Sequence, residues 1–474
     1  MTLRFGTDGW REVIAEEFTL ANVAVVAQAI ADALPGGARP VVVGYDTRFA
    51  SRTAAELAAE VLAANGFEVL LGSGPVPTPA VSFAVRAHGA VAGVVVTASH
   101  NPYWFNGLKL KADFGGSAPP ELTARVEAAL GRTPPRRLGA AKAAARITTV
   151  DLLPAYLEGV GRLVVREPRP VRPLTVIADP LYGAVDGLLA RLLPPAWGSV
   201  RVIHDRADPL FGGLHPEPIP PHLDPLAAEV RRASADLGLA TDCDGDRLGV
   251  IGPDGSYVSP HQVLALLLLH LHRHRGWRGE VVKGFAVGVQ TDRLCERLGL
   301  VLHVTPIGFK HIAPLMLSRD ILIGGEESGG VGFKGHLPER DGLLTALFLL
   351  ECLVMEGKGL PELVAAMEAE AGPAVYQRRD YHLPPEVGRR LLARLDQAPP
   401  ARLGGERVVR REDLDGRKLW LADGAWVLIR PSGTEPVLRV YIEAPEAGEV
   451  EALHAAAADL VRSLAGEREG PASL

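Results

Sequence analysis

The sequence predicts an α/β protein with three related α/β units and a different unit at its C-terminal end. Short apolar strands alternate with helical patterns over most of the chain. Three stretches, 41–46, 175–179 and 321–326, share one shape, in which an apolar strand runs directly into a polar loop. From about Gly372 onward the pattern changes to hairpin signals. A chain of 474 residues has room for about three or four domains.

The first region begins with a helical pattern over residues 19–34. Thr19 is a suitable N-cap, and Pro35-Gly36-Gly37 ends the helix. Residues 91–96 form an apolar run, as expected of a strand covered on both faces of a parallel sheet. A stretch rich in Pro, Arg and Ala at 132–146 is typical of a linker. The other elements expected here are strand 40–43, helix 51–65 and strand 67–71.

After the linker the alternation of strands and helices starts again, twice. Asp254-Gly255 is a hairpin-turn signal that lies between these two units. The expected elements are strand 174–178, helix 183–193, strand 200–204, helix 226–233, strand 237–241, helix 262–271, strand 280–283, helix 291–298, strand 301–305, strand 321–324 and helix 342–355.

The C-terminal region has a different pattern. Asp415-Gly416 and Asp423-Gly424 are hairpin signals, and they precede two apolar strands. A helix and a frayed tail of about ten residues are expected to close the chain. The elements expected are strand 425–429, strand 437–443 and helix 450–464.

The composition excludes several classes of protein. The net charge of -6 argues against a chain that coats nucleic acid or an anionic membrane surface. The apolar run at 263–269 is far short of a membrane span, and the N-terminus lacks the apolar core of a signal peptide. Three cysteines without metal-site or disulfide spacing favour reduced thiols, and we therefore expect a cytoplasmic protein.

The candidate functional residues lie in polar loops, because ligands of open α/β sheets bind beyond the carboxyl ends of the strands. The run Thr97-Ala-Ser99-His100-Asn101-Pro102 follows the strand at 91–96. Its serine is a candidate nucleophile or phosphoryl carrier with a neighbouring base. The alternative is a turn in which the hydroxyl only caps backbone amides. Lys109 follows shortly downstream.

A second loop, Asp242-Cys243-Asp244-Gly245-Asp246-Arg247, places three carboxylates at alternate positions after a strand. Such carboxylates repel one another unless a divalent cation neutralises them. The loop lacks the glycine and the glutamate that an EF-hand requires. A site with a small number of protein ligands, which leaves room for water and phosphate, favours Mg²⁺. Arg247 is suited to a phosphate group beside the metal. The alternative is an exposed acidic turn.

Two further loops are candidates for ligand binding. The glycine-bracketed loop around Glu326 and Ser328 offers an acid and a hydroxyl to sugar hydroxyls, although a simple polar turn explains it as well. The run Arg430-Pro431-Ser432-Gly433-Thr434 combines a guanidinium, two hydroxyls and an accessible backbone, which together favour an anion. A proline-punctuated hairpin is the alternative there.

These four loops, in this order, resemble those of the α-D-phosphohexomutase superfamily. The run Phe5-Gly-Thr-Asp-Gly-Trp-Arg11 is similar to the N-terminal loop of that superfamily, and the matching motifs extend from residue 5 to residue 436. The resemblance implies three similar mixed-sheet α/β domains and a smaller α+β domain around a central cleft. The expected domains are 1–147 with the phosphoserine loop, 148–257 with the metal loop, 258–371 with the sugar loop and 372–474 with the phosphate loop.

The resemblance also implies a mechanism. Phosphorylated Ser99 gives its phosphoryl group to a hexose phosphate, and a hexose 1,6-bisphosphate reorients before Ser99 takes back the other group. Mg²⁺ is expected on Asp242, Asp244, Asp246 and a phosphoserine oxygen at Ser99. The residues expected to bind the substrate are Arg247, Lys310, Glu326, Ser328, Arg340, Arg430, Ser432, Gly433 and Thr434.

The sugar-loop motif looks most like that of glucose-type phosphoglucomutases. Phosphoglucosamine mutases typically carry Gln and His where this chain has Glu327 and Gly330. Without that histidine, the expected acid/base is Lys109, assisted by His100 and Arg11. Arg340 stands where a lysine is common, and it binds anions but is too basic to move protons.

Three alternatives remain open at this point. Within the superfamily, a phosphomannomutase or a dual-specificity enzyme is the nearest alternative. A Mg²⁺-dependent phosphatase with Asp242 as nucleophile would leave the Ser99 and Arg430 loops unexplained. A catalytically silent sugar-phosphate sensor has no feature of the sequence in its favour. The expected partner is a small hexose phosphate, with no nucleic acid and no membrane, and the sequence does not predict an oligomeric state.

Overall fold

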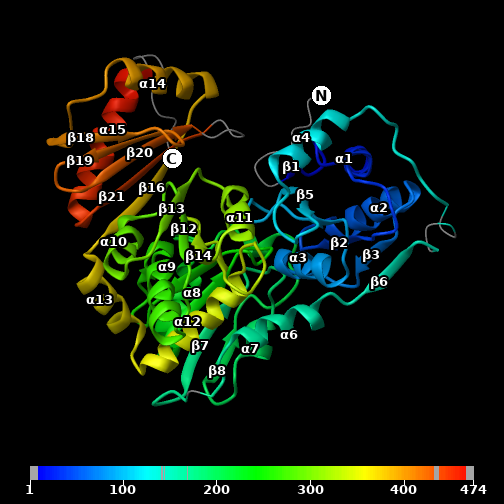
Figure 1. Cartoon of the computed structure of the whole chain (residues 1–474), viewed down its shortest axis with the longest axis horizontal. Helices are drawn as coiled ribbons and strands as arrows, with labels where there is room; N and C mark the ends of the chain where they lie inside the picture. Colours follow the sequence, from blue (N-terminus) through cyan, green and yellow to red (C-terminus); the bar gives the residue numbers. More distant parts are fainter. Residues whose placement is uncertain (1–8, 140–141, 143–144, 168, 432–436, 466–474) are drawn as a thin grey trace. The chain divides into compact units, whose positions relative to one another are not determined.

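The structure is a computed structural model that describes residues 9–139, 142, 145–167, 169–431 and 437–465. It divides into two compact units (Figure 1). Unit 1 comprises residues 1–282 and 308–364, and unit 2 comprises residues 283–307 and 365–474. All described residues of the predicted phosphoserine, metal and sugar loops belong to unit 1. The predicted phosphate loop belongs to unit 2.

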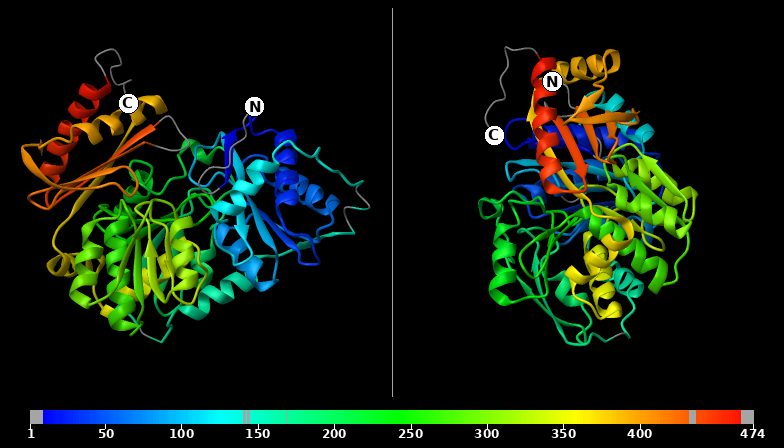
Figure 2. Two further views of the ribbon diagram at one scale, coloured as in Figure 1. Left: turned by 45° about the horizontal axis from the view of Figure 1, so that its top comes forward. Right: turned by 90° about the vertical axis from the view of Figure 1, so that its left-hand side faces the viewer.

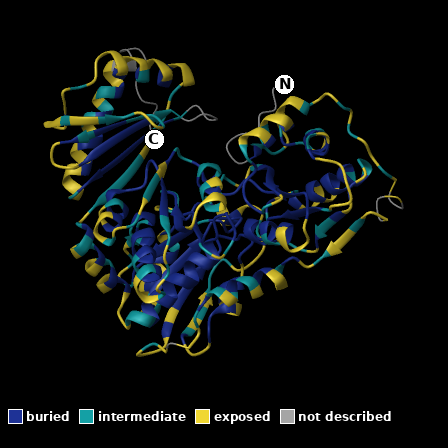
Figure 3. Cartoon of the chain, viewed as in Figure 1, coloured by how far each residue is buried: buried dark blue, intermediate teal, exposed yellow. Residues whose placement is uncertain are grey.

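The first sheet has six strands in the order β1-β5-β4-β2-β3-β6. Its centre is parallel, whereas β5 runs antiparallel to β4. The strands are β1 (Trp10–Val13), β2 (Val41–Tyr45), β3 (Val69–Gly72), β4 (Ala92–Val96), β5 (Phe105–Ala112) and β6 (Ile147–Val150). The helices of this region are α1 (Leu20–Ala33), α2 (Ser51–Ala64), α3 (Thr78–Ala87) and α4 (Pro120–Ala129). The side chains of β2 and β4 are buried along their whole length, as Figure 3 shows for the sheet interiors.

The second sheet has the order β11-β10-β9-β7-β8, with β7 parallel to both of its neighbours and β10 antiparallel to β9. Its strands are β7 (Leu174–Asp179), β8 (Gly198–Val202), β9 (Leu237–Thr241), β10 (Leu248–Ile251) and β11 (Tyr257–Val258). The helices are α6 (Leu153–Leu163), α7 (Leu188–Leu192), the short η1 (Phe211–Gly213) and α8 (Asp224–Ala233). The turn at Asp254-Gly255 joins β10 to β11, as its sequence predicts.

The third sheet has the order β13-β12-β14-β15. Its strands are β12 (Glu280–Gly284), β13 (Leu302–Thr305), β14 (Ile321–Gly325) and β15 (Val331–Phe333), with β15 antiparallel to β14. The helices are α9 (Pro260–Leu269), η2 (His270–His274), α10 (Val289–Leu298), α11 (Phe309–Ser318), α12 (Gly342–Glu356) and α13 (Leu360–Ala371). Asp341 caps the N-terminus of α12 through the backbone N–H of Leu344.

One strand arrangement occurs in all three sheets. The series β5-β4-β2-β3, β10-β9-β7-β8 and β15-β14-β12-β13 have the same order relative to the chain. By this order β14 corresponds to β4 and β9, and not to β2 and β7. The sequence similarity of 41–46, 175–179 and 321–326 therefore matched the third stretch to the wrong strands of the first two units. Three related units are nevertheless present. Any short apolar strand before a polar loop looks alike in sequence, so only pairing identifies its counterpart.

Unit 2 contains a six-stranded antiparallel sheet in the order β16-β21-β20-β19-β18-β17. Its strands are β16 (Val375–His382), β17 (Arg402–Leu403), β18 (Glu406–Glu412), β19 (Arg417–Leu421), β20 (Trp426–Pro431) and β21 (Val437–Ala444). The helices α14 (Pro385–Gln397) and α15 (Ala447–Ala465) pack on this sheet, and Figure 2 shows α15 along it. The two predicted hairpin turns, at Asp415-Gly416 and Asp423-Gly424, join β18 to β19 and β19 to β20.

Several elements differ from those that the sequence predicts. β5 carries Lys109 and Lys111 on a buried stretch, so its polar side chains hid an interior strand of the sheet. α11 contains Pro314, which sequence rules treat as a helix breaker. The predicted helix at 183–193 shortens to α7 because Gly187 adopts a left-handed conformation before it. β6 extends the first sheet to Val150, three residues past the expected first domain.

Two observations bear on the cellular setting. Cys243, Cys295 and Cys352 are all buried free thiols. Among the described residues, no helix has both the length and the apolar character needed to cross a membrane.

Tyr156 generates a prediction about the stability of unit 1. Its hydroxyl donates hydrogen bonds to both carboxylate oxygens of Asp341, at 3.0 and 3.1 Å, and thereby links α6 to the start of α12. We expect Tyr156→Phe to lower the free energy of unfolding by about 1–3 kcal/mol, because a buried carboxylate loses a hydrogen bond. Urea denaturation followed by tryptophan fluorescence measures this change. Tyr103→Phe is the control, because Tyr103 is exposed, and equal stability of the two variants would contradict the prediction.

Candidate active site

Ser99 lies in the loop between β4 and β5, at the position predicted for the phosphoryl carrier. Its Oγ donates a hydrogen bond of 3.0 Å to Oδ2 of Asp242, and the side chain is buried. Its φ of +54° is rare for a residue with a side chain, and such strain persists only where the surroundings enforce it. The backbone N–H of Ser99 is bound by Oγ1 of Thr97 at 2.8 Å. The strained turn therefore holds this hydroxyl against the metal loop.

Arg48 holds the whole serine loop in place, although no sequence motif pointed to it. Its guanidinium donates hydrogen bonds of 2.5 to 3.0 Å to four backbone carbonyls, those of Ser99, Asn101, Pro102 and Phe105. Asp46 forms an ion pair of 3.3 Å with it, and both side chains are fully buried. The available signal was its place in a polar loop directly after the apolar strand β2. Arg48 is therefore a positioning residue for Ser99.

The acidic triplet lies in the loop between β9 and β10, which corresponds in the second sheet to the serine loop between β4 and β5. Oxygen atoms of Asp242, Asp244 and Asp246 all lie within 4.8 Å of one another, and all three residues are fully buried. Oδ1 of Asp242 accepts the backbone N–H groups of Asp246 and Arg247, at 3.0 and 3.1 Å. Gly245 allows this turn, because its φ is +70° and a Cβ would lie 2.3 Å from Val185.

Two cations pair with carboxylates of the triplet. Nζ of Lys109 donates to Asp244 and Asp246 at 2.7 and 2.8 Å, and Nη2 of Arg340 donates to Asp246 at 2.7 Å. The hydroxyl of Thr78, which no sequence motif singles out, donates to Asp244 at 2.5 Å. These contacts bring residues from four separate parts of the chain to one cluster of carboxylates.

The pKa values of the triplet separate in opposite directions. Burial, reinforced by the charges of Asp246 and Asp244, raises the pKa of Asp242 well above its usual range. Burial acts in the same direction on Asp244, but the ammonium of Lys109 outweighs it and lowers the pKa of that carboxyl. At Asp246 burial is likewise outweighed, chiefly by Arg340, and the pKa is lowered. Three crowded carboxylates thus require more positive charge than their neighbours supply.

The triplet fits a small divalent cation. Oδ1 of Asp244 and Oδ1 of Asp246 are both buried without a hydrogen-bond partner among the described residues. Unpartnered carboxylate oxygens that converge with Asp242 and the Ser99 hydroxyl form an all-oxygen donor set, which is the chemistry that Mg²⁺ prefers. The residues present could therefore hold the predicted metal.

Arg247 extends over the triplet at a distance. Its guanidinium lies 3.8 to 3.9 Å from carboxylate oxygens of Asp242, Asp246 and Glu217, which is beyond hydrogen-bond distance. Its buried Nε has no hydrogen-bond partner among the residues that the structure describes. This arrangement leaves a guanidinium beside the metal loop for an anionic ligand.

The sugar loop lies between β14 and β15, the counterpart of the serine and metal loops in the third sheet. Oε2 of Glu326 accepts a hydrogen bond of 3.1 Å from Nη1 of Arg340. Burial raises the pKa of Glu326 to about 7, although Arg340 acts against the rise. Ser328 is half-buried in the same turn. The backbone N–H of Leu248 donates to the carbonyl of Gly329 at 3.1 Å, which ties this loop to the metal loop.

Gly330 and Arg340 depend on each other. A Cβ at Gly330 would lie 2.2 Å from Cδ of Arg340, so the arginine occupies the space that a side chain at 330 would need. Arg340 in turn bridges Glu326 and Asp246 through its two terminal nitrogens. The absence of a histidine at position 330 therefore has a physical reason in the placement of this guanidinium.

The remaining predicted residues of unit 1 surround the same region. Nη1 of Arg11 donates to Oδ1 of Asn101 at 2.9 Å. The pKa of Asp244 is raised by burial and lowered most by Lys109, and the charge of Arg11 makes a smaller contribution that also lowers it. His100 is half-buried beside Ser99. Lys310 lies half-buried in the first turn of α11, next to Phe309, whose ring centroid is 5.8 Å from the Arg340 guanidinium carbon.

The predicted phosphate loop is described only in part. Arg430, in β20, donates through Nε to Asp415 at 2.8 Å. Ser432, Gly433 and Thr434 lie outside the described residues, as do residues 5–8 of the predicted N-terminal loop.

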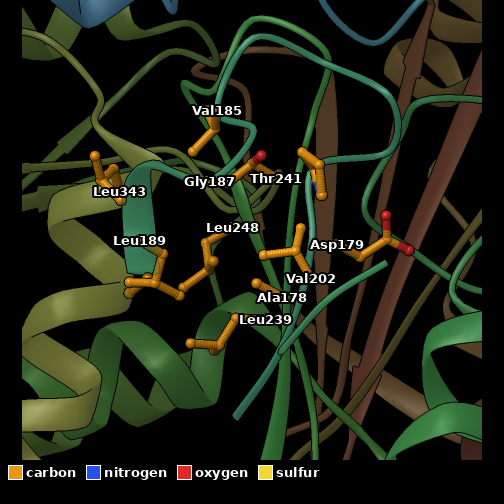
Figure 4. A pocket seen from close by; sticks show the side chains of 12 residues that line it. Ala178, Asp179, Val185, Gly187, Leu189, Val202, Leu239, Thr241, Leu248 and Leu343 are labelled. Atoms are coloured by element: carbon orange, nitrogen blue, oxygen red, sulfur yellow. The ribbon is translucent and has the colours of Figure 1, made fainter. Parts of the chain in front are cut away.

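A small cavity beneath the metal loop is too small for a sugar phosphate. Figure 4 shows its lining, which includes Asp179, Thr241 and Leu248 from the second sheet and Leu343 from α12. Its volume of about 20 Å³ has room for about one water molecule.

Comparison with known proteins agrees with this geometry. Family models for phosphoglucomutase/phosphomannomutase α/β/α domains I, II and III match residues 2–136, 154–255 and 259–370. The model for the C-terminal domain of that family matches residues 354–460.

Curated relatives and solved structures cover nearly the whole chain. A phosphoglucosamine mutase of Frankia casuarinae is 33% identical, covering 98% of this chain and 99% of its own. A phosphoglucomutase/phosphomannomutase of Thermococcus kodakarensis is 31% identical, covering 93% and 94%. A structure from Thermus thermophilus, provisionally assigned as a phosphomannomutase, has 39% identity and a TM-score of 0.86, covering 98% and 99%. The chain thus belongs to the phosphoglucomutase/phosphomannomutase family of the α-D-phosphohexomutase superfamily, whose members are intramolecular phosphotransferases.

Proposed function

We propose that this phosphohexomutase interconverts glucose 1-phosphate and glucose 6-phosphate through a phosphoserine at Ser99 and a hexose 1,6-bisphosphate. The observation that carries the proposal is the 3.0 Å hydrogen bond from Ser99 Oγ to Asp242, at the edge of a fully buried acidic triplet. A hydroxyl held there can carry a phosphoryl group next to bound positive charge.

The proposed reaction has two matched transfers. In the first, a sugar hydroxyl attacks the phosphorus atom on Ser99, the bond from phosphorus to Oγ breaks, and a bond from phosphorus to the sugar oxygen forms. The proton of the attacking hydroxyl passes to a base, and the released Oγ takes up a proton to become a hydroxyl. After the bisphosphate reorients, the Ser99 hydroxyl gives its proton to a base as Oγ attacks the other phosphoryl group, and the released sugar oxygen recovers a proton. The enzyme therefore ends the cycle phosphorylated, as it began. Because the second transfer moves a phosphoryl group from the bisphosphate to Ser99, the bisphosphate can also serve as the activator of an unphosphorylated enzyme.

Asp242, Asp244, Asp246 and a phosphoserine oxygen would hold Mg²⁺, which supplies positive charge against the developing charge of the transferred group. Lys109 is the proposed acid/base, with His100 and Arg11 assisting. Its ammonium group binds two carboxylates, a contact that favours the protonated amine. Proton acceptance by Lys109 therefore requires that this pairing weaken, and a metal ion that binds the carboxylates would weaken it.

The proposed substrate contacts follow from charge and hydrogen-bonding capacity. Arg247 and Lys310 are offered to phosphate oxygens, and Glu326 and Ser328 to sugar hydroxyls. Arg340 binds anions beside them. In unit 2, Arg430, Ser432, Gly433 and Thr434 are the proposed ligands of the phosphate that is not transferred.

A phosphatase that uses Asp242 as nucleophile has less support. Both carboxylate oxygens of Asp242 already accept hydrogen bonds, one from Ser99 and one from two backbone N–H groups. Attack on phosphorus by Oδ2 would break the contact with Ser99, and the serine loop would then have no role. The serine loop, by contrast, is held by the four hydrogen bonds of Arg48.

Glucosamine phosphate is a second candidate substrate, because several relatives at 30–34% identity are named phosphoglucosamine mutases. Mannose phosphate is a third, because the names of the Thermococcus relative and the Thermus structure include phosphomannomutase. Glu327 and Gly330 favour glucose on the motif resemblance. At position 330 the contact between the glycine and Arg340 supports this choice, since a histidine cannot enter without displacing the arginine.

The first prediction concerns Ser99. We expect Ser99→Ala to lose nearly all turnover while it remains folded, because the substitution removes the proposed phosphoryl carrier and only one hydrogen bond. Intact mass and peptide mapping after incubation with glucose 1,6-bisphosphate measure phosphorylation. Ser73→Ala is the control, because Ser73 is exposed and outside the site. Phosphate on another residue of the wild-type protein would refute the mechanism.

The second prediction concerns the metal. We expect EDTA to abolish activity and added Mg²⁺ to restore it, because the buried carboxylates need a cation. Asp244→Asn should require at least about tenfold more Mg²⁺ for half-maximal activity, because it removes one charged ligand. Activity against Mg²⁺ concentration is the measurement. Full activity of the EDTA-treated wild type would show that no metal is needed.

The third prediction concerns the sugar. Glucose and mannose differ only at the 2-hydroxyl, whereas contacts shared by the two bound orientations should involve the 3- and 4-hydroxyls. We expect kcat/KM to be highest for glucose 1-phosphate and roughly 10–200-fold lower, but measurable, for mannose 1-phosphate. A panel that also contains glucosamine 1-phosphate tests the second candidate. Higher kcat/KM for mannose or glucosamine 1-phosphate would reassign the substrate without changing the mechanism.

Glu326→Gln tests the shared contact itself. It should reduce kcat/KM for glucose and mannose 1-phosphate by similar factors, because the carboxylate is proposed to bind hydroxyls that both sugars have. Glu16→Gln is the matched control, because Glu16 is exposed. A loss confined to one sugar would show that Glu326 reads the 2-position.

A further inference from the structure

A second cluster with metal-ligand chemistry lies outside the acidic triplet. Ligand atoms of His215, Glu217 and His222 all lie within 4.8 Å of one another. The three residues lie between η1 and α8 in unit 1. Glu217 is buried and the two histidines are half-buried. Two imidazoles and one carboxylate are a frequent ligand set for zinc-type cations, and they leave a fourth position for water.

One ring nitrogen of His215 is placed as a metal ligand can be. Its Nε2 is buried and has no hydrogen-bond partner among the described residues. A ring nitrogen of a neutral imidazole that meets no other partner can offer its lone pair to a metal ion. The ring centroids of His215 and His222 are 4.7 Å apart.

The backbone of this segment is held before any ligand binds. Its sequence, His215-Pro-Glu-Pro-Ile-Pro-Pro-His222, has prolines at positions 216, 218, 220 and 221. Proline fixes φ and so reduces the conformational entropy that ligand binding would otherwise cost. Two backbone hydrogen bonds, from Ile219 to Glu217 at 2.8 Å and from His222 to Ile219 at 2.9 Å, close the loop on itself.

We propose that His215, Glu217 and His222 form a second divalent-cation site, selective for a zinc-type ion over Mg²⁺. Selectivity follows from the donor atoms, since imidazole nitrogen favours Zn²⁺ and Co²⁺, whereas Mg²⁺ prefers oxygen and binds the triplet. Tetrahedral Zn²⁺ would bring the ligand atoms to about 3.5 Å from one another, inside the 4.8 Å that bounds their separations here. This inference does not depend on the sugar or the phosphoserine.

The site is connected to the active site through one ion-pair contact. Oε1 of Glu217 lies 3.9 Å from Nη1 of Arg247, the guanidinium that also faces Asp242 and Asp246. A cation on Glu217 takes over its charge and repels Arg247. We therefore expect zinc to inhibit turnover at saturating Mg²⁺ by acting on the position of Arg247.

Co²⁺ binding tests the site directly. Protein in excess Mg²⁺ is titrated with CoCl₂, equilibrium dialysis counts bound ions, and the visible absorption of Co²⁺ reports nitrogen coordination. We expect one Co²⁺ per chain, displaced by Zn²⁺. His222→Gln should weaken Co²⁺ binding at least about tenfold, and His222→Cys should retain it and add a thiolate-to-metal absorption band.

Matched variants separate this site from other histidines and from the triplet. His274→Gln is the control. His274 pairs with Glu356 at 3.1 Å, so this variant also removes a histidine that lies beside a glutamate, but outside the proposed site. His274→Gln and Asp244→Asn should both keep the Co²⁺ ion. Absence of bound Co²⁺ in the wild type, or equal binding by His222→Gln and His274→Gln, would overturn the proposal. The wild-type count decides this even if a variant fails to fold.

Discussion

The need to neutralise three buried carboxylates organises unit 1. Asp242, Asp244 and Asp246 have no exposed surface, and a charged group removed from water is stable only when it is paired. The cations come from far along the chain, Lys109 from β5 and Arg340 from the residue two before α12 begins. Burial of the triplet therefore forces the first and third sheets to contribute to the loop of the second. The same cluster of charge that constrains the fold is the one that fits a metal ion.

A single strand arrangement explains why the three loops meet. In each sheet the functional loop joins a central strand to its antiparallel neighbour, β4 to β5, β9 to β10 and β14 to β15. Each copy supplies a different chemistry at the same topological place: a hydroxyl at Ser99, carboxylates at 242–246 and a carboxylate at Glu326. A backbone hydrogen bond from Leu248 to Gly329 fixes the metal loop to the sugar loop, and one from Thr78 fixes the start of α3 to Asp244 of the metal loop. The site is thus precise although its residues lie on loops.

Arg340 connects the metal loop to the sugar loop. It bridges the metal loop and the sugar loop, and it occupies the space beside Gly330. A side chain at position 330 would therefore have to displace Arg340. Glu326, which Arg340 holds, has a pKa raised by burial to about 7. Protonation of Glu326 would weaken the ion pair, so the contact between the two loops is sensitive to pH near neutrality.

Motifs and alternation in the sequence were enough to determine the α/β class, three related units, a different C-terminal unit, and the serine and acidic loops. These features are local, because a strand, a turn and a run of carboxylates are written in neighbouring residues. Tertiary structure alone decided which strands correspond, that β5 is an interior strand that carries buried lysines, and that Arg48 and Thr78 support the site. It also brought His215, Glu217 and His222 together. Such contacts depend on strand pairing and on charge balance between distant residues, which no local pattern encodes.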